Sequence, residues 1–294
     1  MCAVKKKAYG KINLFLDIEE RRNDGYHNIM SVMQTVDWCD TVSVSKNNDP
    51  EIKVISSNSG IPCDSSNIAY KVAKVFFEKL GIAPAVTIEI EKNIPIAAGM
   101  AGGSADGAAT LEALNELFDS PFSQKDLILM SQNIGADIPF CLVKGTKLIS
   151  GIGEIIENIE GSFPECFILC AKPNNVNIST PAAYRELDSV YRNFVGYSYE
   201  KNKLENLLMG IREENIEKIT ASMYNIFEKT QSAIDADVAT IKSTMLKYGA
   251  LGAMMSGSGP SVFGIFSDEA KANSACEFFK RNNIIARSCR PTRK

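Results

Sequence analysis

Hydrophobic and polar residues alternate strictly along several stretches of the chain. Between residues 10 and 18 every second position is hydrophobic, which is typical of a strand with one buried face. The same pattern predicts strands at residues 29–38, 41–46, 51–56 and 86–91. Lys11 and Asn13 then share the polar face of the first strand. On pattern alone, we interpret that face as the solvated side of a sheet.

Helical spacing of hydrophobic residues predicts the other elements. Residues 67–80 form a helix that ends at Gly81, and another helix opens at Ser104. Further helices are expected after Ser123 and Ser179, two or three between residues 204 and 248, and one at 268–280. Strands at 165–171, 262–266 and 284–286 complete the pattern. A change of composition near residues 161–164 predicts two domains, 1–160 and 161–294.

An aspartate lies at a predicted corner of the chain. Gly135 ends one helix, Pro139 is expected to prevent another from starting, and residues 141–143 read as a strand. Asp137 would therefore be held on a tight turn, either for chemistry or simply to bond its own backbone. A second turn, Asp24-Gly25, precedes Tyr26 and His27. These two side chains either hold a planar ligand or cap a hairpin, with the histidine in solvent.

Composition excludes several classes of function. The 294 residues are 45% hydrophobic and 23% charged, with a net charge of −3, which gives no reason to expect a nucleic-acid or membrane partner. The eight cysteines form no C-x-x-C pair and there is one histidine, so we expect reduced thiols and no structural zinc. No apolar run resembles a signal peptide or a membrane span, and a cytoplasmic protein is expected.

The most informative stretch is a glycine-rich loop between a strand and a helix. It reads P-I-A-A-G-M-A-G-G-S-A-D from Pro95 to Asp106. Glycines allow close approach of backbone to a ligand, and a helix start offers free N–H groups, so the loop predicts a phosphate site. It lacks the Gly-Lys-Ser/Thr of a Walker A loop and the glycine spacing of a dinucleotide fingerprint. A second turn, Met255-Ser-Gly-Ser-Gly-Pro260, reads either as a plain hairpin or as an anion-binding nest.

The loop resembles the P-x-x-x-G-[LM]-[GA]-G-G-S-[SA]-D motif of the GHMP kinases, the small-molecule kinases of galactose, homoserine, mevalonate and phosphomevalonate. The resemblance extends over almost the whole chain through R-R-x-D-G-Y-H, G-A-D-I-P-F and the second glycine turn. It implies an α+β fold of two domains, mixed and antiparallel sheets covered by helices, and an active site in the cleft between the domains. It also implies an ATP- and Mg²⁺-dependent kinase. The closest branch phosphorylates a cytidine diphosphate-linked polyol of isoprenoid synthesis, as a monomer or homodimer.

The resemblance also assigns roles to residues. Asp137 would be the general base and Lys11 would keep it ionised, while Asn13 orients the same substrate. Tyr26 and Tyr184 would sandwich the cytosine, His27 would bond its edge and Thr180 would touch the diphosphate. Ser104 is the remaining candidate for a metal contact. The implied ATP-binding residues are Pro95, Ile96, Ala97, Ala98, Gly99, Met100, Ala101, Gly102, Gly103, Ser104 and Ala105.

Small departures from the common motif leave open questions. Ala101, Ala105 and Gly107 stand where Gly, Ser and Ala are frequent. Ala101 should be tolerated if its φ is negative, and Ala105 lacks the hydroxyl that a metal contact at this position would use. Two alternatives stay open: another GHMP kinase of the homoserine or mevalonate type, or a non-catalytic ATP-binding sensor. The presence of both Lys11 and Asp137 argues against the sensor.

Overall fold

The computed structural model describes residues 3–292 and divides them into two compact units. Unit 1 holds residues 3–10, 38–96 and 101–143, and unit 2 holds residues 11–37, 97–100 and 144–292. This division differs from the single boundary predicted at 160/161. The reason is that two long strands and the glycine-rich loop each contribute residues to both units, which no change of local composition reveals.

The two long strands form a hairpin. Strand β1 spans Ala3–Arg21 and β2 spans His27–Lys46. The predicted Asp24-Gly25 turn joins them: Gly25 has φ +86°, and the Arg22 amide donates to the Tyr26 carbonyl at 2.8 Å. The two strands predicted at 29–38 and 41–46 are in fact one. The polar residue between them, Asp40, is fully buried and bonded, so it does not interrupt the strand.

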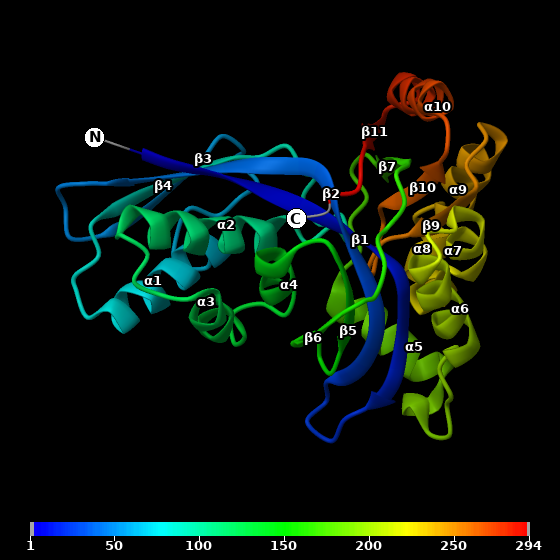
Figure 1. Ribbon diagram of the computed structural model, residues 1–294, viewed down its shortest axis with the longest axis horizontal. Helices are drawn as coiled ribbons and strands as arrows, with labels where there is room; N and C mark the ends of the chain where they lie inside the picture. Colours follow the sequence, from blue (N-terminus) through cyan, green and yellow to red (C-terminus); the bar gives the residue numbers. More distant parts are fainter. Residues whose placement is uncertain (1–2, 293–294) are drawn as a thin grey trace. The chain divides into compact units, whose positions relative to one another are not determined.

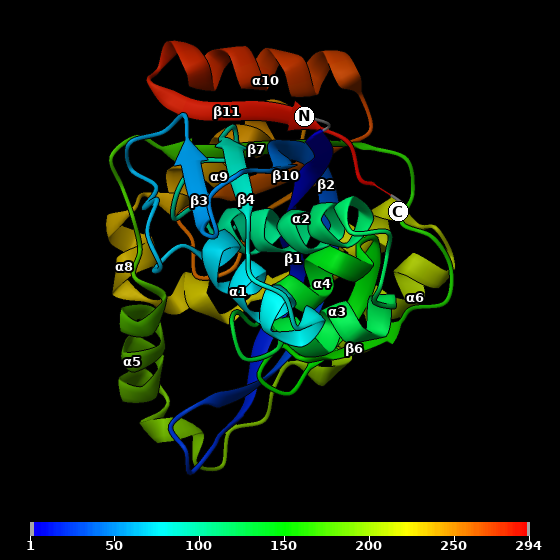
Figure 2. The ribbon, with the colours of Figure 1, turned by 90° about the vertical axis from the view of Figure 1, so that its left-hand side faces the viewer.

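Unit 1 combines a small sheet with helices. Strand β3 (Ile52–Ser56) is parallel to β4 (Val86–Glu91), and β4 is antiparallel to the second half of β2. Figure 2 shows its four helices, and the first two pack on each other. Gly81 ends α1 in the left-handed conformation, as expected, whereas Asn67, predicted as the first helical residue, is its N-cap. The helices are α1 (Ile68–Leu80), α2 (Gly102–Leu117), α3 (Gln124–Ser131) and α4 (Ile138–Val143).

The strand predicted at residues 141–143 is wrong, because α4 is a helix. Pro139 was expected to stop a helix here. It lies instead in the first turn of α4, where a backbone N–H would have no hydrogen-bond partner inside the helix. The absence of an N–H in proline therefore costs nothing there, and its fixed φ is close to the helical value. The side chains of α4 from Ile138 to Leu142 are buried, so packing stabilises this short helix.

Unit 2 contains a β-hairpin, a four-stranded sheet and the remaining helices (Figure 1). Strands β5 (Thr146–Ser150) and β6 (Ile155–Asn158) form the hairpin, and β5 pairs with the first half of β2. The antiparallel sheet has the order β11-β7-β10-β9. Its strands are β7 (Phe167–Pro173), β9 (Gly252–Met255), β10 (Val262–Phe266) and β11 (Ile284–Cys289).

The helices predicted after Ser179 and at residues 268–280 are present, but residues 201–247 form four α-helices and one 3-10 helix where two or three helices were predicted. A two-residue strand, β8 (Tyr224–Asn225), runs parallel to β1 at Phe15 and Leu16. The buried core of the unit includes Phe227, Phe266 and Phe279. The helices are α5 (Thr180–Val190), η1 (Arg192–Phe194), α6 (Lys201–Arg212), α7 (Ile216–Ser222), η2 (Ile226–Lys229), α8 (Gln231–Asp235), α9 (Val238–Lys247) and α10 (Glu269–Arg281).

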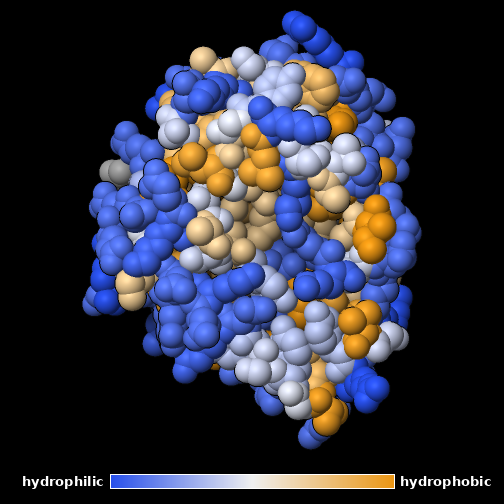
Figure 3. Space-filling model, turned by 90° about the vertical axis from the view of Figure 1, so that its right-hand side faces the viewer, coloured by the Kyte–Doolittle hydropathy of each residue, from blue (hydrophilic) through white to orange (hydrophobic). Residues whose placement is uncertain are grey.

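On the face drawn in Figure 3, hydrophobic groups gather above and around the centre, bordered by hydrophilic ones, and others lie singly nearer the edge. Exposed large hydrophobic side chains of unit 2, such as Val195, Ile234 and Phe278, come from different elements. Within residues 3–292, no helix is long and apolar enough to cross a bilayer. Of the seven cysteines within residues 3–292, five are buried.

Candidate active site

The glycine-rich loop leaves β4 and enters α2 with a strained backbone. Gly99 has φ +70°, and two alanines, Ala97 and Ala101, also have positive φ values of +50° and +55°. The negative φ at which Ala101 would be tolerated without strain is therefore not adopted. Only glycine adopts this conformation without a steric penalty, so two alanines here store strain in the loop. Such strain is typical of segments that are shaped for a ligand.

The first turn of α2 is open to an anion. Ala101 occupies the N-cap position and has no side chain that could accept a hydrogen bond, and the first turn carries no acidic residue. The leading N–H groups of a helix have no partner inside the helix, and together they form the positive end of its dipole. The turn Gly102–Ser104 can therefore bind phosphate through backbone N–H groups.

The second glycine turn packs directly against the loop. The Ser256 hydroxyl donates to the Gly99 carbonyl at 2.9 Å. A Cβ atom on Gly99 would lie 2.1 Å from the Ser256 carbonyl oxygen, and one on Gly257 would lie 3.0 Å from the Gly99 oxygen. The two turns therefore touch backbone to backbone, which requires glycine at both positions. The interpretation of residues 255–260 as a plain hairpin does not account for this contact.

A buried amide holds the second turn in place. Asn225, in β8, is 3% exposed and donates from Nδ2 to the carbonyls of Met255 and Gly257 at 2.7 and 2.8 Å. The Thr180 and Ser258 hydroxyls are 2.8 Å apart, so the start of α5 reaches the same turn. The predicted diphosphate contact, Thr180, thus lies in unit 2 beside the second glycine turn.

Lys11 and Asn13 are buried, so the interpretation of a solvated face is wrong. Lys11 is 4% exposed, and its Nζ donates to Asn13 Oδ1 at 2.8 Å. Asn13 donates to the Ser31 hydroxyl at 2.9 Å, and that hydroxyl donates to the Phe15 carbonyl at 2.7 Å. The Lys11 amide also donates to the Met100 carbonyl at 3.1 Å. This bond ties the first strand to the glycine-rich loop within unit 2.

Asp137 lies immediately before α4 in unit 1. Its carbonyl accepts from the Cys141 amide at 3.0 Å, the first helical bond, so the residue is fixed at the start of α4. A Cβ atom on Gly135 would lie 3.6 Å from Ser104 Oγ. The Gly135–Asp137 corner therefore lies beside the first turn of α2, and Asp137 is half-buried there.

His27 is enclosed, and the alternative that places it in solvent is wrong. Its Nε2 is 2.7 Å from Asp188 Oδ1, and its ring stacks on Tyr184 with centroids 4.8 Å apart. Phe194, in a left-handed turn at φ +62°, packs edge-on at 5.7 Å. Thr180, Tyr184 and Asp188 are spaced by four residues and so share one face of α5. Tyr26, by contrast, is 63% exposed.

A buried ionic cluster lies under the glycine-rich loop in unit 1. Lys92 Nζ is 2.7 Å from Asp106 Oδ2 and also contacts Asp40 Oδ2. Asp40 Oδ1 accepts from the amides of Asn93 and Ile94 at 2.5 and 2.7 Å. Burial, and next the neighbouring Asp40, raise the pKa of Asp106 to about 7 although Lys92 opposes the shift.

Comparison with known proteins shows to which family the chain belongs. Residues 67–145 match the model for the N-terminal domain of the GHMP kinases, and residues 206–285 match the model for their C-terminal domain. The chain belongs to the GHMP kinase family. ATP is therefore its phosphoryl donor, and the predicted two-domain fold is confirmed.

Several relatives of this GHMP kinase extend over its full length. It is 42% identical to the 4-diphosphocytidyl-2-C-methyl-D-erythritol kinase of Caldicellulosiruptor bescii, covering 97% of this chain and 98% of that one. It is 40% identical to the enzyme of that name from Clostridioides difficile, covering 92% and 88%. A solved 4-(cytidine 5'-diphospho)-2C-methyl-D-erythritol kinase superposes with a TM-score of 0.79 at 25% identity, covering 98% of both chains. A homoserine kinase from Cytophaga hutchinsonii superposes at 0.76 with 20% identity, which shows the shared fold alone.

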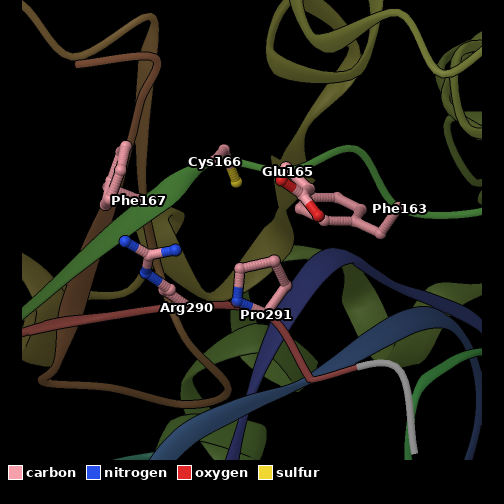
Figure 4. A pocket seen from close by; sticks show the side chains of 6 residues that line it. All are labelled: Phe163, Glu165, Cys166, Phe167, Arg290 and Pro291. Carbon is pink, nitrogen blue, oxygen red and sulfur yellow. The ribbon is translucent and has the colours of Figure 1, made fainter. Parts of the chain in front are cut away.

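A cavity elsewhere in this GHMP kinase is not part of the candidate site. About 420 Å³ in volume, it lies in unit 2 where β7 begins and β11 has ended (Figure 4). The Arg290 guanidinium lies 4.8 Å over the Phe167 ring, and burial raises the pKa of the Cys166 thiol to about 12, which makes it unreactive. The lining residues are Phe163, Glu165, Cys166, Phe167, Arg290 and Pro291, none of which was predicted to bind ligand.

Sequence reasoning missed four residues that support the site. Asp188 holds His27, Asn225 holds the second glycine turn, and Asp40 and Lys92 lie under the loop with Asp106. The spacing of Asp188 four residues after Tyr184 was the one available signal. The others have no local pattern, because each partner is distant in sequence.

Proposed function

We propose that this GHMP kinase transfers the γ-phosphoryl group of ATP to the 2-hydroxyl of 4-diphosphocytidyl-2-C-methyl-D-erythritol (CDP-methylerythritol). The products would be the 2-phosphate and ADP, in the non-mevalonate isoprenoid pathway. The observation that carries the proposal is 42% identity over 97% of the chain to a kinase named for this substrate. The geometry of the loop and of the His27 environment supports it independently.

The glycine-rich loop would hold the ATP phosphates. The leading N–H groups of α2, which have no partner inside the helix, would donate to the phosphate oxygens. The second glycine turn, fixed by Asn225, keeps Gly99 in its left-handed conformation. Because the loop is held before ATP arrives, little ordering is left for the binding step.

Asp137 would act as general base on the substrate hydroxyl, and Lys11 would polarise that hydroxyl. Proton removal then accompanies attack on the γ-phosphorus. The position of Asp137 beside the first turn of α2 in unit 1 supports this role. The hydrogen bonds from Lys11 to Asn13 and from Asn13 to Ser31 support the role of Lys11, because they fix the direction of its ammonium group. Asn13 would also orient the substrate.

The base-recognition group would be His27, with Tyr26 and Tyr184. One face of Tyr184 already stacks on His27, so Tyr184 supports the histidine in addition to any contact with cytosine. Tyr26 is exposed and can cover a base from the side of the hairpin turn. Aromatic stacking of this kind is worth about 1–3 kcal/mol per base. Thr180 would contact the diphosphate together with Ser258.

Mg²⁺ would neutralise the phosphates. The described residues contain no cluster of three or more metal-ligating side chains. This agrees with a Mg²⁺ ion that is bound mainly by ATP oxygens and water and needs few protein ligands. Ser104, in the first turn of α2, is the hydroxyl placed to contribute. Ala105 has no hydroxyl group with which to contact the ion.

Turnover by purified protein tests the proposal. ATP and CDP-methylerythritol should give ADP, and Asp137→Asn should lower kcat by at least about a hundredfold while ATP still binds. Cytidine diphosphate should compete with the substrate but not with ATP. Competition by homoserine or mevalonate instead would favour the other kinases of the family. ATP binding without turnover in the unaltered protein would favour a sensor.

A further inference from the structure

A short segment after α5 is held in an unusual backbone conformation. All three residues of η1 have positive φ values, which are +49° at Arg192, +56° at Asn193 and +62° at Phe194. Asparagine tolerates this conformation, but arginine and phenylalanine adopt it only when their surroundings hold them there. The segment lies beside the end of the β1–β2 hairpin, where His27 is found (Figure 2).

A buried carboxylate fastens the end of this segment to β1. Asp17 is 0% exposed, and its Oδ1 accepts the Tyr197 hydroxyl at 2.8 Å. Its Oδ2 accepts from the Glu200 amide at 2.9 Å. The Tyr197 amide in turn donates to the Phe194 carbonyl at 3.2 Å, so the anchored residue and the strained one belong to the same turn. Buried polar groups that are bonded in this way resist rearrangement, because breaking either bond leaves a buried group without a partner.

Aromatic packing carries this support to His27. The rings of Tyr197 and Phe194 meet edge-on with centroids 5.2 Å apart, and Tyr191 stacks on Phe194 at 5.3 Å. The Phe194 ring meets the His27 imidazole edge-on at 5.7 Å, a favourable geometry for two aromatic rings. Phe194 is 5% exposed, so little of its surface is left for a ligand. Its contacts therefore support the histidine.

The imidazole of His27 is fixed by three neighbours. Tyr184 stacks on the ring at 4.8 Å, Asp188 Oδ1 lies 2.7 Å from Nε2, and Phe194 packs edge-on. The outer torsion of a histidine side chain is broad, and an unsupported ring is able to turn over and exchange the places of its nitrogens. Because Asp188 occupies Nε2, Nδ1 is the ring nitrogen that remains for a base.

We propose that Phe194 is a positioning residue, held by Tyr197 and Asp17, that fixes the orientation of the His27 imidazole and thereby sets the preference for cytosine over uracil. The inference rests on the proposed function, since it concerns recognition of the base in the cytidine substrate. Phe194 acts through His27 and does not touch the substrate.

The physical reason is the opposite hydrogen-bonding pattern of the two bases. Cytosine presents an amino donor beside a ring-nitrogen acceptor, and uracil presents a carbonyl acceptor beside an N–H donor. An imidazole in one orientation matches only one of these patterns, and the wrong base leaves its polar groups unpaired. A ring that turns over offers its other nitrogen as well, so that the distinction between the bases is lost.

The test compares the binding of cytidine diphosphate (CDP) and uridine diphosphate (UDP). Titration calorimetry of the full chain in excess Mg-ADP, which occupies the ATP site, gives both Kd values. The unaltered protein should bind CDP at least about tenfold more tightly than UDP. Phe194→Leu keeps a hydrophobic side chain and the same backbone penalty but loses the ring. It should weaken CDP binding by about three- to tenfold and leave UDP binding within about twofold.

Turnover separates positioning from a general loss of structure. In Phe194→Leu the KM for the cytidine substrate should rise by the same factor as the Kd for CDP, while kcat and the KM for ATP stay unchanged. Tyr197→Phe removes the hydroxyl that Asp17 accepts and keeps the ring, so it should shift the ratio of Kd values in the same direction by less. Val195→Ala is the matched control, because this neighbouring side chain is 86% exposed, and it should change neither constant.

The outcomes distinguish this inference from the proposed function. An unchanged ratio of the CDP and UDP constants in Phe194→Leu would overturn the inference, and so would an equal weakening of both. Failure of the unaltered protein to bind CDP or to turn over CDP-methylerythritol would overturn the proposed function instead.

A measurement without substitution covers the case in which Phe194→Leu does not fold. His27 is the single histidine of the chain, so its imidazole signals in ¹⁵N-histidine-labelled protein without an affinity tag need no assignment. The two ring nitrogens should give separate signals of one tautomer, with the hydrogen on Nε2, before and after CDP is added. Signals averaged over both tautomers would show a ring that is not held and would overturn the inference.

Discussion

Ser256 donates its hydroxyl hydrogen to the carbonyl oxygen of Gly99 across 2.9 Å, and 157 residues of sequence separate the two. This bond joins the two glycine turns of unit 2 at the point where neither has room for a methyl group. Asn225 fixes one side of the contact and the amide of Lys11 fixes the loop at Met100. The shape of the predicted phosphate loop is thus imposed by its neighbours as well as by its own glycines.

Gly99→Ala should weaken nucleotide binding and destabilise the fold. Its Cβ would lie 2.1 Å from the Ser256 oxygen, and alanine at φ +70° is strained, so we expect a loss of about 2 kcal/mol or more. Thermal unfolding and Mg-ADP titration measure the two effects. Gly103→Ala is the control for thermal stability, because the nearest atom to its Cβ is an Ile68 methyl at an ordinary 3.5 Å. Equal melting temperatures for both variants would contradict the contact.

Ala101→Gly should stabilise the protein. Alanine at φ +55° carries a penalty of about 1–2 kcal/mol, and glycine avoids it at the cost of about 0.5–1 kcal/mol of backbone entropy. The net gain is about 0.5–1 kcal/mol in the free energy of unfolding, measured with urea. If the variant is less stable than the unaltered protein, Ala101 is not strained in solution. Ala98→Gly, at a position without positive φ, should destabilise and serves as the control.

Asp188→Ala should raise the KM for the cytidine substrate about tenfold and leave the KM for ATP unchanged. The carboxylate holds His27 at Nε2, and losing a buried partner of this kind costs about 1–3 kcal/mol. Asp188→Asn should restore part of the affinity, because its amide oxygen still accepts the hydrogen. Asp235→Asn, on the exposed end of α8, is the charge control. A rise in the KM for ATP instead would show that the effect reaches beyond the His27 environment.

Stability should fall with rising pH through the titration of Asp106. The pKa of Asp106 in the folded protein is about 7, above the ordinary value of 3.8. Between these two pH values the folded protein therefore keeps a proton on Asp106 that the unfolded chain has released. The contribution is fully present below about pH 4 and is lost as pH rises through 7, by at most about 1.4 kcal/mol per pH unit. Urea unfolding at pH 5, 6, 7 and 8 should show this slope in the difference between the unaltered protein and Asp106→Asn. A difference that stays constant with pH would mean that Asp106 is ionised throughout.

Local pattern predicted the elements whose signals lie within a few residues. Gly81 ends α1 as its position predicted, and the strands predicted at residues 86–91 and 262–266 are β4 and β10 with their observed limits. It failed at α4, where packing of buried side chains outweighed the proline signal. It also failed at Lys11, because a polar side chain on an alternating strand reads as exposed whether or not another element covers it.

The sequence by itself determined most of the order of the elements, the glycines of both turns and membership of the GHMP kinase family. Only the tertiary structure decided which polar groups meet: His27 with Asp188, Lys92 with Asp40 and Asp106, and Asn225 with the second glycine turn. The partners of these bonds are separated by between 14 and 161 residues. Side-chain periodicity reports which face of an element is buried. It carries no information on which distant residue is buried against that face, and that choice is made by packing.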